Sequence, residues 1–328
     1  MNVDVVIVGA GPVGLAAAIE IRRRQMTAVV VDKGSLVNSL VGYPNGMEFF
    51  STPDLLEIGG DPLVTARYKP VREEALDYYR RVADAEGLNL LLYESVVKVE
   101  GQEGAFTVQT SKRIINSRYV VVATGFFDQP NRLDVPGADL PKLSHYFKEA
   151  FAYAGREVLI VGAKNSAAKA ALQCRRRGAT VTMVVRGPEI GPTVKYWIRP
   201  DLINRIEEGS IRAHFDSTIS NISETEVELL TPKGPITIDN DIILAMTGYH
   251  PDYGLLNSFG IGIEEDEAET PVYDDSTFET NRPGMFIAGT ICGGRFTSRW
   301  FIENGRFHAK VIAETLAQRG NQLGGLPL

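Results

Sequence analysis

Two glycine-rich turns in this chain have the residue types and the spacing that bind the phosphates of a dinucleotide. The first, Gly9-Ala10-Gly11-Pro12-Val13-Gly14, fits the pattern G-x-G-x-x-G. In this pattern the first glycine makes a tight turn, the second lets a pyrophosphate approach the backbone, and the third lets the helix pack close to the sheet. The pattern is specific only when it joins a strand to a helix and an acidic residue ends the next strand. Asp32 holds that acidic position, where its carboxylate is expected to accept hydrogen bonds from a ribose.

The second turn is Gly162-Ala163-Lys164-Asn165-Ser166-Ala167. It departs from the pattern at Lys164, where the second glycine would stand. A lysine side chain there blocks the closest backbone approach, but its ammonium can reach a phosphate itself. The strand that follows ends on Arg186 instead of an acid, and an arginine at this place accommodates a 2′-phosphate. The turn therefore predicts NADPH rather than NADH, with a solvated charge at a strand end as the alternative for Arg186.

Apolar and alternating runs predict the elements that position these turns. The expected strands are 5–8, 28–31, 88–92, 95–99, 105–110, 114–122, 158–161, 180–185, 227–230, 236–238, 241–245 and a last strand within 280–289. The expected helices are 15–24, 70–85, 168–177, a stretch within 190–212, and 301–316. Ala123-Thr124-Gly125 and Met246-Thr247-Gly248 each end a strand, so one architecture occurs twice.

This repeat predicts an α/β protein with two Rossmann-like, three-layer (ββα) dinucleotide-binding domains. The second domain, 126–250, is inserted in the first, 1–125 and 251–328. The long segment 34–60 contains an aromatic stretch, 43–52, which is expected to lie over a bound cofactor; a surface loop with a small core of its own is the alternative. Residues 320–328 lack periodicity and predict a loose tail.

Composition narrows the class of protein. The 328 residues are 44% hydrophobic and 23% charged, with a net charge of −7 and no long basic block, which disfavours nucleic acid or an anionic membrane as partner. No apolar run approaches the ~18 residues of a membrane span. The N-terminus begins directly with a strand, so we expect a cytoplasmic protein. The two cysteines, Cys174 and Cys292, form no C-x-x-C motif, and no dense Cys/His cluster predicts a metal site.

The order of these motifs resembles the two-dinucleotide-domain flavoproteins of the thioredoxin reductase type over almost the whole chain. Several segments more closely resemble the YpdA-type bacillithiol-disulfide reductases. These segments are MEFFST (47–52), EIGG (57–60), KPVREEALDYYRRVA (69–83), ATGFFDQPN (123–131), GAKNSAA (162–168) and FIENGRFHA (301–309). The resemblance implies FAD in the first domain, NADPH in the second, a low-molecular-weight disulfide as substrate, and a homo-oligomer.

The resemblance also implies which residues contact the cofactors. For FAD they are Gly9, Gly11, Pro12, Val13, Gly14, Asp32, Lys33, Val97, Ala123, Thr124, Gly125, Gly289 and Thr290. For NADPH they are Gly162, Ala163, Lys164, Asn165, Ser166, Ala167, Arg186, Thr247 and Gly248.

Three residues depart from what the resemblance leads us to expect. The family commonly has a cysteine at the position of Val13, whose side chain cannot form a mixed disulfide. Thr290 stands where related flavoproteins have an aspartate that binds the ribityl chain; a hydroxyl can still make that hydrogen bond, but without charge. Cys292 follows two residues later and is a candidate catalytic thiol near the flavin, with a small buried thiol as the alternative.

Without a C-x-x-C pair, the flavin must reduce its acceptor directly or with one thiol at most. We expect a disulfide substrate, with Arg295, Arg299 and Arg306 as candidates for binding an anionic one; a solvated helix entry is the alternative for these arginines. Electron transfer to ferredoxin or flavodoxin, and a non-catalytic flavin redox sensor, remain as alternative functions. A monooxygenase is less favoured, because this length leaves no room for an extra substrate domain.

Overall fold

The structure, a computed structural model, describes residues 1–323, with side chains up to Arg319, and divides into two compact units. The first unit comprises Met1–Gly42, Gly46–Gln129 and Tyr249–Leu328, and the second comprises Tyr43–Asn45 and Pro130–Gly248. Both units are mixed α/β, as the repeat in the sequence predicts. No helix among residues 1–323 is long and apolar enough to cross a membrane.

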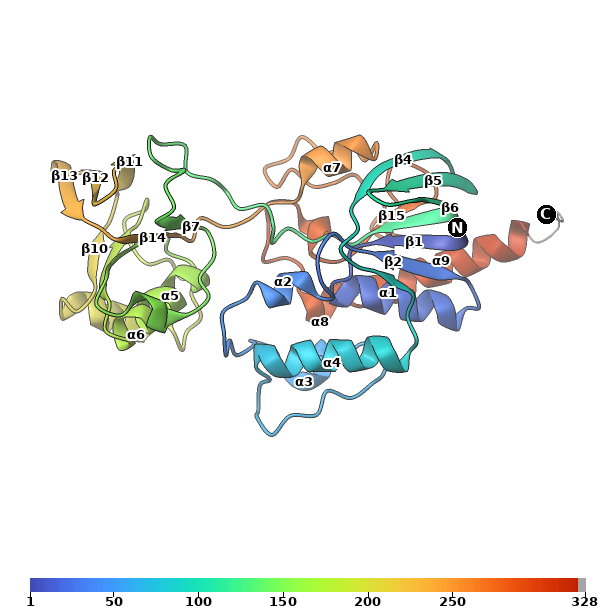
Figure 1. Cartoon of the computed structure of the whole chain (residues 1–328), viewed down its shortest axis with the longest axis horizontal. Coiled ribbons are helices and arrows are strands. Elements are labelled where there is room, and N and C mark those ends of the chain that lie inside the picture. Colours follow the sequence, from blue (N-terminus) through green and yellow to red (C-terminus); the bar gives the residue numbers. More distant parts are fainter. Residues whose placement is uncertain (324–328) are drawn as a thin grey trace. The chain divides into compact units, whose positions relative to one another are not determined.

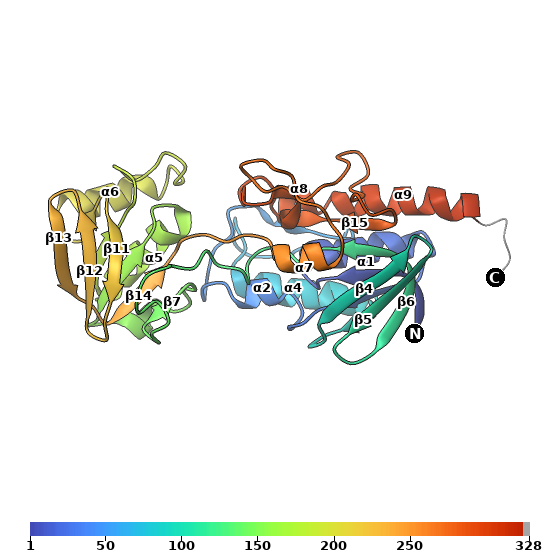
Figure 2. The same cartoon turned by 90° about the horizontal axis from the view of Figure 1, so that it is seen from above.

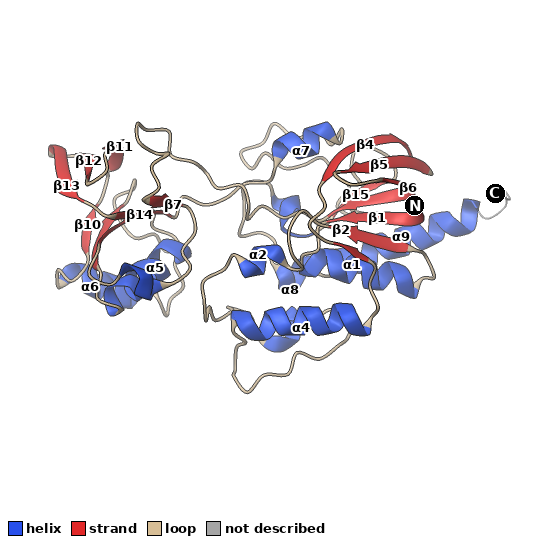
Figure 3. Cartoon of the chain, in the orientation of Figure 1, coloured by secondary structure: helices blue, strands red, loops and turns tan. Residues whose placement is uncertain are grey.

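The first unit is built on a seven-stranded sheet (Figures 1 and 3). Its strands are β1 (Asn2–Val8), β2 (Ala28–Val31), β3 (Leu90–Leu91), β4 (Val96–Gln102), β5 (Ala105–Thr110), β6 (Ile114–Val122) and β15 (Met285–Ile287). The strand order is β3-β2-β1-β6-β5-β4, and β15 pairs with β6. β1 pairs in parallel with β2 and β6, whereas β4, β5 and β6 form an antiparallel meander. The parallel strands contain continuous buried apolar runs at residues 5–8, Ala28–Val31 and Met285–Ile287, as is typical of strands buried on both faces.

The helices of the first unit are α1 (Pro12–Arg23), α2 (Asn38–Val41), α3 (Pro53–Leu56), α4 (Arg72–Ala85), α7 (Tyr253–Ser258), α8 (Ile302–Gly305) and α9 (His308–Leu323). A 3-10 turn, Gly289–Gly293, follows β15. α1 and α9 lie side by side and pack against each other, while α7 lies beside β4 (Figures 1 and 2). The sheet is therefore covered on one face by helices.

The second unit repeats this plan with a shorter sheet of five parallel strands, in the order β10-β9-β8-β14-β7. The strands are β7 (Leu143–Ser144), β8 (Glu157–Val161), β9 (Thr180–Val184), β10 (Arg212–His214) and β14 (Ile242–Ala245). An antiparallel meander consists of β11 (Thr218–Ile222), β12 (Glu226–Thr231) and β13 (Gly234–Asp239). The helical elements are α5 (Asn165–Arg176), α6 (Arg199–Glu207) and a 3-10 turn, Ala150–Tyr153.

Two cores fill the second unit, one on each face of its sheet. One contains Ile160, Ala171 and Leu202, from β8, α5 and α6. The other contains Leu159 from β8 and Val227 and Leu229 from the meander. Because neighbouring residues of β8 point to opposite faces, the strand separates helices from meander, which is the three-layer arrangement predicted.

The C-terminal helix differs from its prediction. Instead of one helix over 301–316, the chain forms α8 and then α9, which continues to Leu323. The predicted tail from Gly320 is therefore wrong for residues 320–323, and residues 324–328 lie outside the described part. Helix α1 also begins at Pro12, earlier than predicted, because a proline is well tolerated at the first position of a helix.

The segments that join the units also differ from their predicted limits. Residues 126–129 and 249–250 belong to the first unit rather than the second. The ring of Tyr249 lies 5.0 Å from that of Phe127, centroid to centroid, and the His250 amide donates to the Gln129 carbonyl at 3.0 Å. These contacts attach the two crossing segments to each other on the first unit's side.

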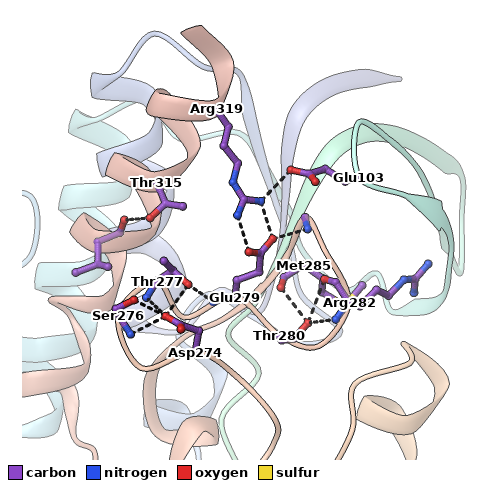
Figure 4. A network of polar contacts seen from close by, with 12 residues as sticks. Glu103, Asp274, Ser276, Thr277, Glu279, Thr280, Arg282, Met285, Thr315 and Arg319 are labelled. Carbon is purple, nitrogen blue, oxygen red and sulfur yellow. Dashed lines mark hydrogen bonds and ion pairs between the residues drawn. The ribbon is translucent and has the colours of Figure 1, made fainter. Parts of the chain in front are cut away.

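A charged cluster fastens α9 to the sheet of the first unit (Figure 4). Arg319 donates to Glu279 at 2.5 and 2.6 Å and to Glu103 at 2.8 Å. Glu279 also accepts from the Gly284 amide at 2.8 Å. The hydrogen bonds from Arg319 and Gly284 outweigh burial and lower the pKa of Glu279.

Replacing Arg319 with methionine is expected to lower the free energy of unfolding by roughly 2 kcal/mol, because the half-buried Glu279 loses its charge partner. Arg80→Met is the matched control: Arg80 pairs with Asp84 one helical turn away in α4, and both side chains are exposed. The control should change stability by less than about 0.5 kcal/mol. Thermal denaturation of the two variants measures this difference, and equal melting temperatures would contradict it.

Candidate functional site

The N-terminus of α1 has open amide groups and open space beside it. Its cap residue is Gly11, and no side chain caps it. A Cβ atom built on Gly11 would have nothing within 4 Å. The first amides of an α-helix lack partners within the helix and favour an anion, so this end of α1 has the chemistry of a phosphate site.

The other two glycines of the turn are required by packing. Gly9 has φ +113°, and a Cβ atom there would lie 2.5 Å from the Ala123 carbonyl oxygen. A Cβ atom on Gly14 would lie 1.9 Å from the Gly9 carbonyl oxygen. The three glycines thus have separate roles, as their spacing predicts: Gly9 and Gly14 bring backbone segments together, and Gly11 leaves the space.

Asp32, at the end of β2, is held by backbone amides. One carboxylate oxygen accepts from Ala10 at 2.7 Å and the other from Gly34 at 2.7 Å. Burial raises the pKa of this carboxyl, although the two amides oppose the shift. Lys33 beside it forms an ion pair with Asp128 at 2.5 Å. Each oxygen of Asp32 has a second lone pair, so the carboxylate can still accept from a hydroxyl.

Segments far apart in the sequence meet beside this turn. Val13 lies against Gly289, where an added Cβ would come within 3.1 Å of the valine side chain. Gly125 faces Thr290, whose hydroxyl would lie 3.4 Å from a Cβ on the glycine. The hydroxyl of Thr124 is buried and has no partner among residues 1–323. The Thr124 amide would lie 3.1 Å from a Cβ on Gly9, so Thr124 borders the glycine turn. A buried, unpartnered hydroxyl beside this turn fits a bound dinucleotide such as FAD.

Val97 is the sequence candidate whose surroundings differ most from the others. It lies in β4, at the edge of the sheet, and its side chain is 49% exposed. The pairing of β4 with β5 shifts its register between Val96 and Lys98, so Val97 occupies a bulge. Val97 therefore has no paired residue in β5, unlike its neighbours Val96 and Lys98.

The second unit has a matching helix terminus. Lys164 is the cap residue of α5 and no side chain caps the helix. Gly162 has φ +123°, and a Cβ there would lie 2.6 Å from the Met246 carbonyl oxygen. Thr247 donates to the Asn131 carbonyl at 2.5 Å, and Gly248 has φ +91°. The structure thus brings the glycine turn and the strand-end segment 246–248 together, as in the first unit.

Exposed polar residues surround the start of α5. Lys164 and Ser166 are exposed there, Ala163 is half-buried and Ala167 is buried. Arg186 is exposed just after β9 and makes no hydrogen bond or ion pair within the described part of the chain. Asn165 holds the segment 193–195 against the helix, a contact that sequence reasoning missed. The only signal for it was an asparagine at the first position of the helix.

Cys292 does not have the surroundings of a reactive thiol. It is fully buried, and burial raises its pKa far above the ordinary value. Its sulfur lies 3.8 Å from Nδ1 of His308, which accepts from the Gly289 amide at 3.1 Å. Burial also lowers the pKa of His308 to about 4, so the imidazole is neutral and cannot stabilise a thiolate by charge. Cys174 is equally buried, with its pKa raised to about 12.

The three arginines proposed for an anionic substrate are engaged within the fold. Arg306 donates to the carbonyls of Asp54 and Glu57. Arg295 pairs with Glu269 at 2.8 Å, and Arg299 lies 4.0 Å from Asp275. Arg295 and Arg299 remain partly exposed. Arg306 is the least available, because its guanidinium fastens α8 to α3.

Residues 6–289 match the family model described as pyridine nucleotide-disulphide oxidoreductase. The chain belongs to this family. It is 43% identical over 318 residues to the bacilliredoxin reductase Bdr of Bacillus subtilis, covering 96% of this chain and 98% of that protein.

Two solved structures show the same relationship. The bacillithiol disulfide reductase Bdr (YpdA) from Bacillus cereus superposes with a TM-score of 0.95 at 41% identity, covering 97% of this chain and 100% of the other. The enzyme of that name from Staphylococcus aureus gives 0.94 at 40%, covering 97% and 99%. These relationships confirm the YpdA-type resemblance, the fold class, and an FAD- and NADPH-dependent oxidoreductase.

Proposed function

We propose that this protein uses NADPH to reduce the disulfide of bacillithiol or a closely similar low-molecular-weight thiol. The observation that carries this proposal is the 40–43% identity to Bdr proteins over nearly the full length of each chain. A ferredoxin–NADP reductase or a flavin redox sensor is not favoured, because these relatives are named as disulfide or bacilliredoxin reductases.

The proposal assigns one cofactor to each unit. In the first unit, the open space at Gly11 and the uncapped start of α1 support binding of the FAD pyrophosphate there. Asp32 would accept hydrogen bonds from the ribose hydroxyls. The hydroxyls of Thr124 and Thr290 would make hydrogen bonds with the ribityl chain. The bulge at Val97 would offer backbone groups to the cofactor. Among the remaining FAD candidates, Gly9 and Gly14 lie close together in the turn, Gly9 contacts Ala123, Val13 contacts Gly289, and Gly125 faces Thr290. Pro12 is the first residue of α1, and Lys33 follows Asp32.

In the second unit, the uncapped start of α5 supports binding of the NADPH pyrophosphate, and Arg186 supports binding of its 2′-phosphate. Lys164 extends from the cap position and would add a positive charge to the phosphate site. Asn165, Ser166 and Ala167 form the first turn of the helix, and Gly162, Ala163, Thr247 and Gly248 surround it.

When bound, FAD supplies the two-electron chemistry between NADPH and a disulfide, which is released as two thiols. The chain's own residues bind and orient the reactants. No side chain among residues 1–323 offers an exposed thiol, since both cysteines are buried. Val13 contributes packing against Gly289 at the position where the family commonly has a cysteine. We therefore propose disulfide reduction without a mixed disulfide to the protein.

A second candidate acceptor is a small redox protein. The Bacillus subtilis relative is named a bacilliredoxin reductase, whereas the relatives from Bacillus cereus and Staphylococcus aureus are named bacillithiol disulfide reductases. A bacilliredoxin that carries a mixed disulfide with bacillithiol presents the same sulfur–sulfur bond on a protein. The rates at which the two acceptors reoxidise the reduced protein distinguish these two candidates.

Stopped-flow reoxidation of the NADPH-reduced protein tests the proposal. The acceptor panel contains bacillithiol disulfide, bacilliredoxin in its bacillithiolated form, glutathione disulfide, ferredoxin and oxygen. We expect fast reoxidation by one of the two bacillithiol-containing acceptors. Reoxidation by ferredoxin or oxygen alone would contradict the proposed disulfide reduction.

Val13→Cys should change the rate of reoxidation by less than about threefold if the reaction requires no mixed disulfide at this position.

Arg186→Ser is expected to raise KM for NADPH about 100-fold and to leave KM for NADH nearly unchanged. The physical reason is that the guanidinium makes a charge-assisted contact with the 2′-phosphate, which NADH lacks. Arg177→Ser is a suitable control, because Arg177 lies at the opposite end of α5. Equal KM values of the wild-type protein for the two nucleotides would contradict the role of Arg186.

A further inference from the structure

One loop of the second unit, Gly187–Ile198, is fixed beside the glycine turn. The Lys195 amide donates to Oδ1 of Asn165 at 2.9 Å, and Nδ2 of Asn165 donates to the Thr193 carbonyl at 3.3 Å. Asn165 is the first residue of α5. Both polar atoms of one side chain thus hold this loop against the helix end that is proposed to bind the NADPH pyrophosphate.

The same loop presents two aromatic rings to solvent. Tyr196 is 81% exposed and Trp197 is 45% exposed, and their rings meet edge to face with centroids 4.8 Å apart. Val194 and Ile198 on either side are buried in the core. The anchors on both sides fix the loop, so the exposure of the rings is built into its conformation. A fixed, exposed aromatic pair is a feature of binding surfaces.

The position of the loop suggests what the rings bind. In an open α/β sheet, a dinucleotide lies beyond the carboxyl ends of the strands, with its 2′-phosphate near the end of the second strand. Here that strand is β9, which ends at Val184, and Arg186 follows after Val185. The loop begins at the next residue and returns to the start of α5. It therefore runs from the expected place of the 2′-phosphate to that of the pyrophosphate, and the ribose that joins these two groups also carries the adenine.

We propose that the loop Gly187–Ile198 is a clamp for the adenosine end of NADPH, in which the Tyr196–Trp197 pair packs against the adenine. This inference rests on the proposed binding of NADPH to the second unit and adds the residues that recognise its base. The rings supply apolar and π surface, which every base accepts, and Arg186 supplies the charge for the 2′-phosphate. Asn165 is a positioning residue, because it holds the loop and not the ligand.

Binding of two nucleotide fragments to the flavin-loaded protein separates these roles. The fragments are 2′,5′-ADP, which has the adenine and the 2′-phosphate, and 5′-AMP, which lacks the 2′-phosphate. Calorimetry gives Kd for each. Trp197→Ala and Tyr196→Ala should each raise Kd for both fragments about tenfold, the effect of losing one base–aromatic contact. Arg186→Ser should raise Kd for 2′,5′-ADP alone.

Two controls accompany this experiment. Tyr68→Ala removes a tyrosine that is also 81% exposed but lies in the first unit, and it should leave both Kd values unchanged. The chain has two tryptophans, so fluorescence reports the loop directly. Binding of 2′,5′-ADP should quench the emission of the wild-type protein and of Trp300→Phe, but not that of Trp197→Phe.

The outcomes distinguish the clamp from the NADPH site itself. Suppose that Tyr196→Ala and Trp197→Ala bind both fragments with the same Kd values as Tyr68→Ala, while Arg186→Ser binds 2′,5′-ADP weakly. The proposed clamp is then wrong, and the proposed NADPH site is still supported. If the wild-type protein binds neither fragment, the binding of NADPH to this unit is wrong and the clamp with it. Asn165→Ala should weaken both fragments together, and unchanged binding would contradict its role in holding the loop.

Discussion

Gly11→Ala is expected to yield a folded protein without its yellow flavin. A Cβ atom at this position has nothing within 4 Å in the protein, so it costs the fold little. The same Cβ occupies the space that a pyrophosphate needs to reach the free amides at the start of α1. We expect the affinity for FAD to fall at least about 100-fold, because the phosphates lose their backbone hydrogen bonds. The visible absorbance of the purified protein and its far-ultraviolet circular dichroism measure the two effects separately.

Gly14→Ala provides the contrast. A Cβ atom there would lie 1.9 Å from the Gly9 carbonyl oxygen, so α1 must move away from the sheet. This variant should be destabilised by roughly 3 kcal/mol or more and lose flavin as a consequence of a damaged fold. If Gly11→Ala instead retained stoichiometric FAD, the phosphate site at α1 would be wrong. If it unfolded like Gly14→Ala, the open space would not be a feature of the protein.

Acid is expected to destabilise the first unit through His308. The imidazole is 2% exposed, and burial, with a smaller effect of Arg299, lowers its pKa from 6.5 to about 4. The unfolded state therefore binds a proton at a higher pH than the folded state. The free energy of unfolding therefore has its full value above pH 6.5, where His308 is neutral in both states. It falls progressively as the pH decreases toward 4. From this shift, the loss amounts to about 3 kcal/mol.

Urea denaturation of the first unit as a function of pH measures this loss, and His308→Gln isolates it. The variant should be less stable at neutral pH, because glutamine does not fill the space between Phe278 and Trp300, against which the imidazole packs. Its stability should then change less between pH 6.5 and 4 than that of the wild-type protein. His145 and His214, whose pKa values burial also lowers, lie in the second unit and contribute equally to both proteins. The same dependence of unfolding free energy on pH in the wild-type protein and in His308→Gln would contradict the prediction.

Much of the chemistry at the glycine turns was visible in the sequence, since it depends on local geometry. A strand, a G-x-G-x-x-G turn and a helix form one continuous segment, so spacing alone predicted separate roles for Gly9, Gly11 and Gly14. The strand-end segments 123–125 and 246–248 were found in the same way, because each repeats one device at the end of a buried strand. The double occurrence of this device also predicted two three-layer domains.

Contacts between segments far apart in the chain could not be predicted from the sequence. Arg306 was a candidate for substrate binding by charge alone, but its guanidinium is occupied by backbone carbonyls about 250 positions away, at Asp54 and Glu57. Cys292 was a candidate thiol by its place after the last strand, but burial raises its pKa, and its sulfur lies against Nδ1 of the buried His308. The spacing of apolar residues over 301–316 likewise does not indicate that the chain breaks into α8 and α9.

The sequence by itself determined the fold class and the family of chemistry. It also predicted two dinucleotide sites, a preference for a 2′-phosphate through Arg186, and no C-x-x-C dithiol. These features follow from residue type and short spacing, which set backbone geometry and charge within one segment. Only the tertiary structure decided which charged and thiol side chains remain available, and which loop Asn165 holds beside the second glycine turn. Burial and partner choice are properties of the packed chain, because a side chain's desolvation and its neighbours depend on segments that meet only after folding.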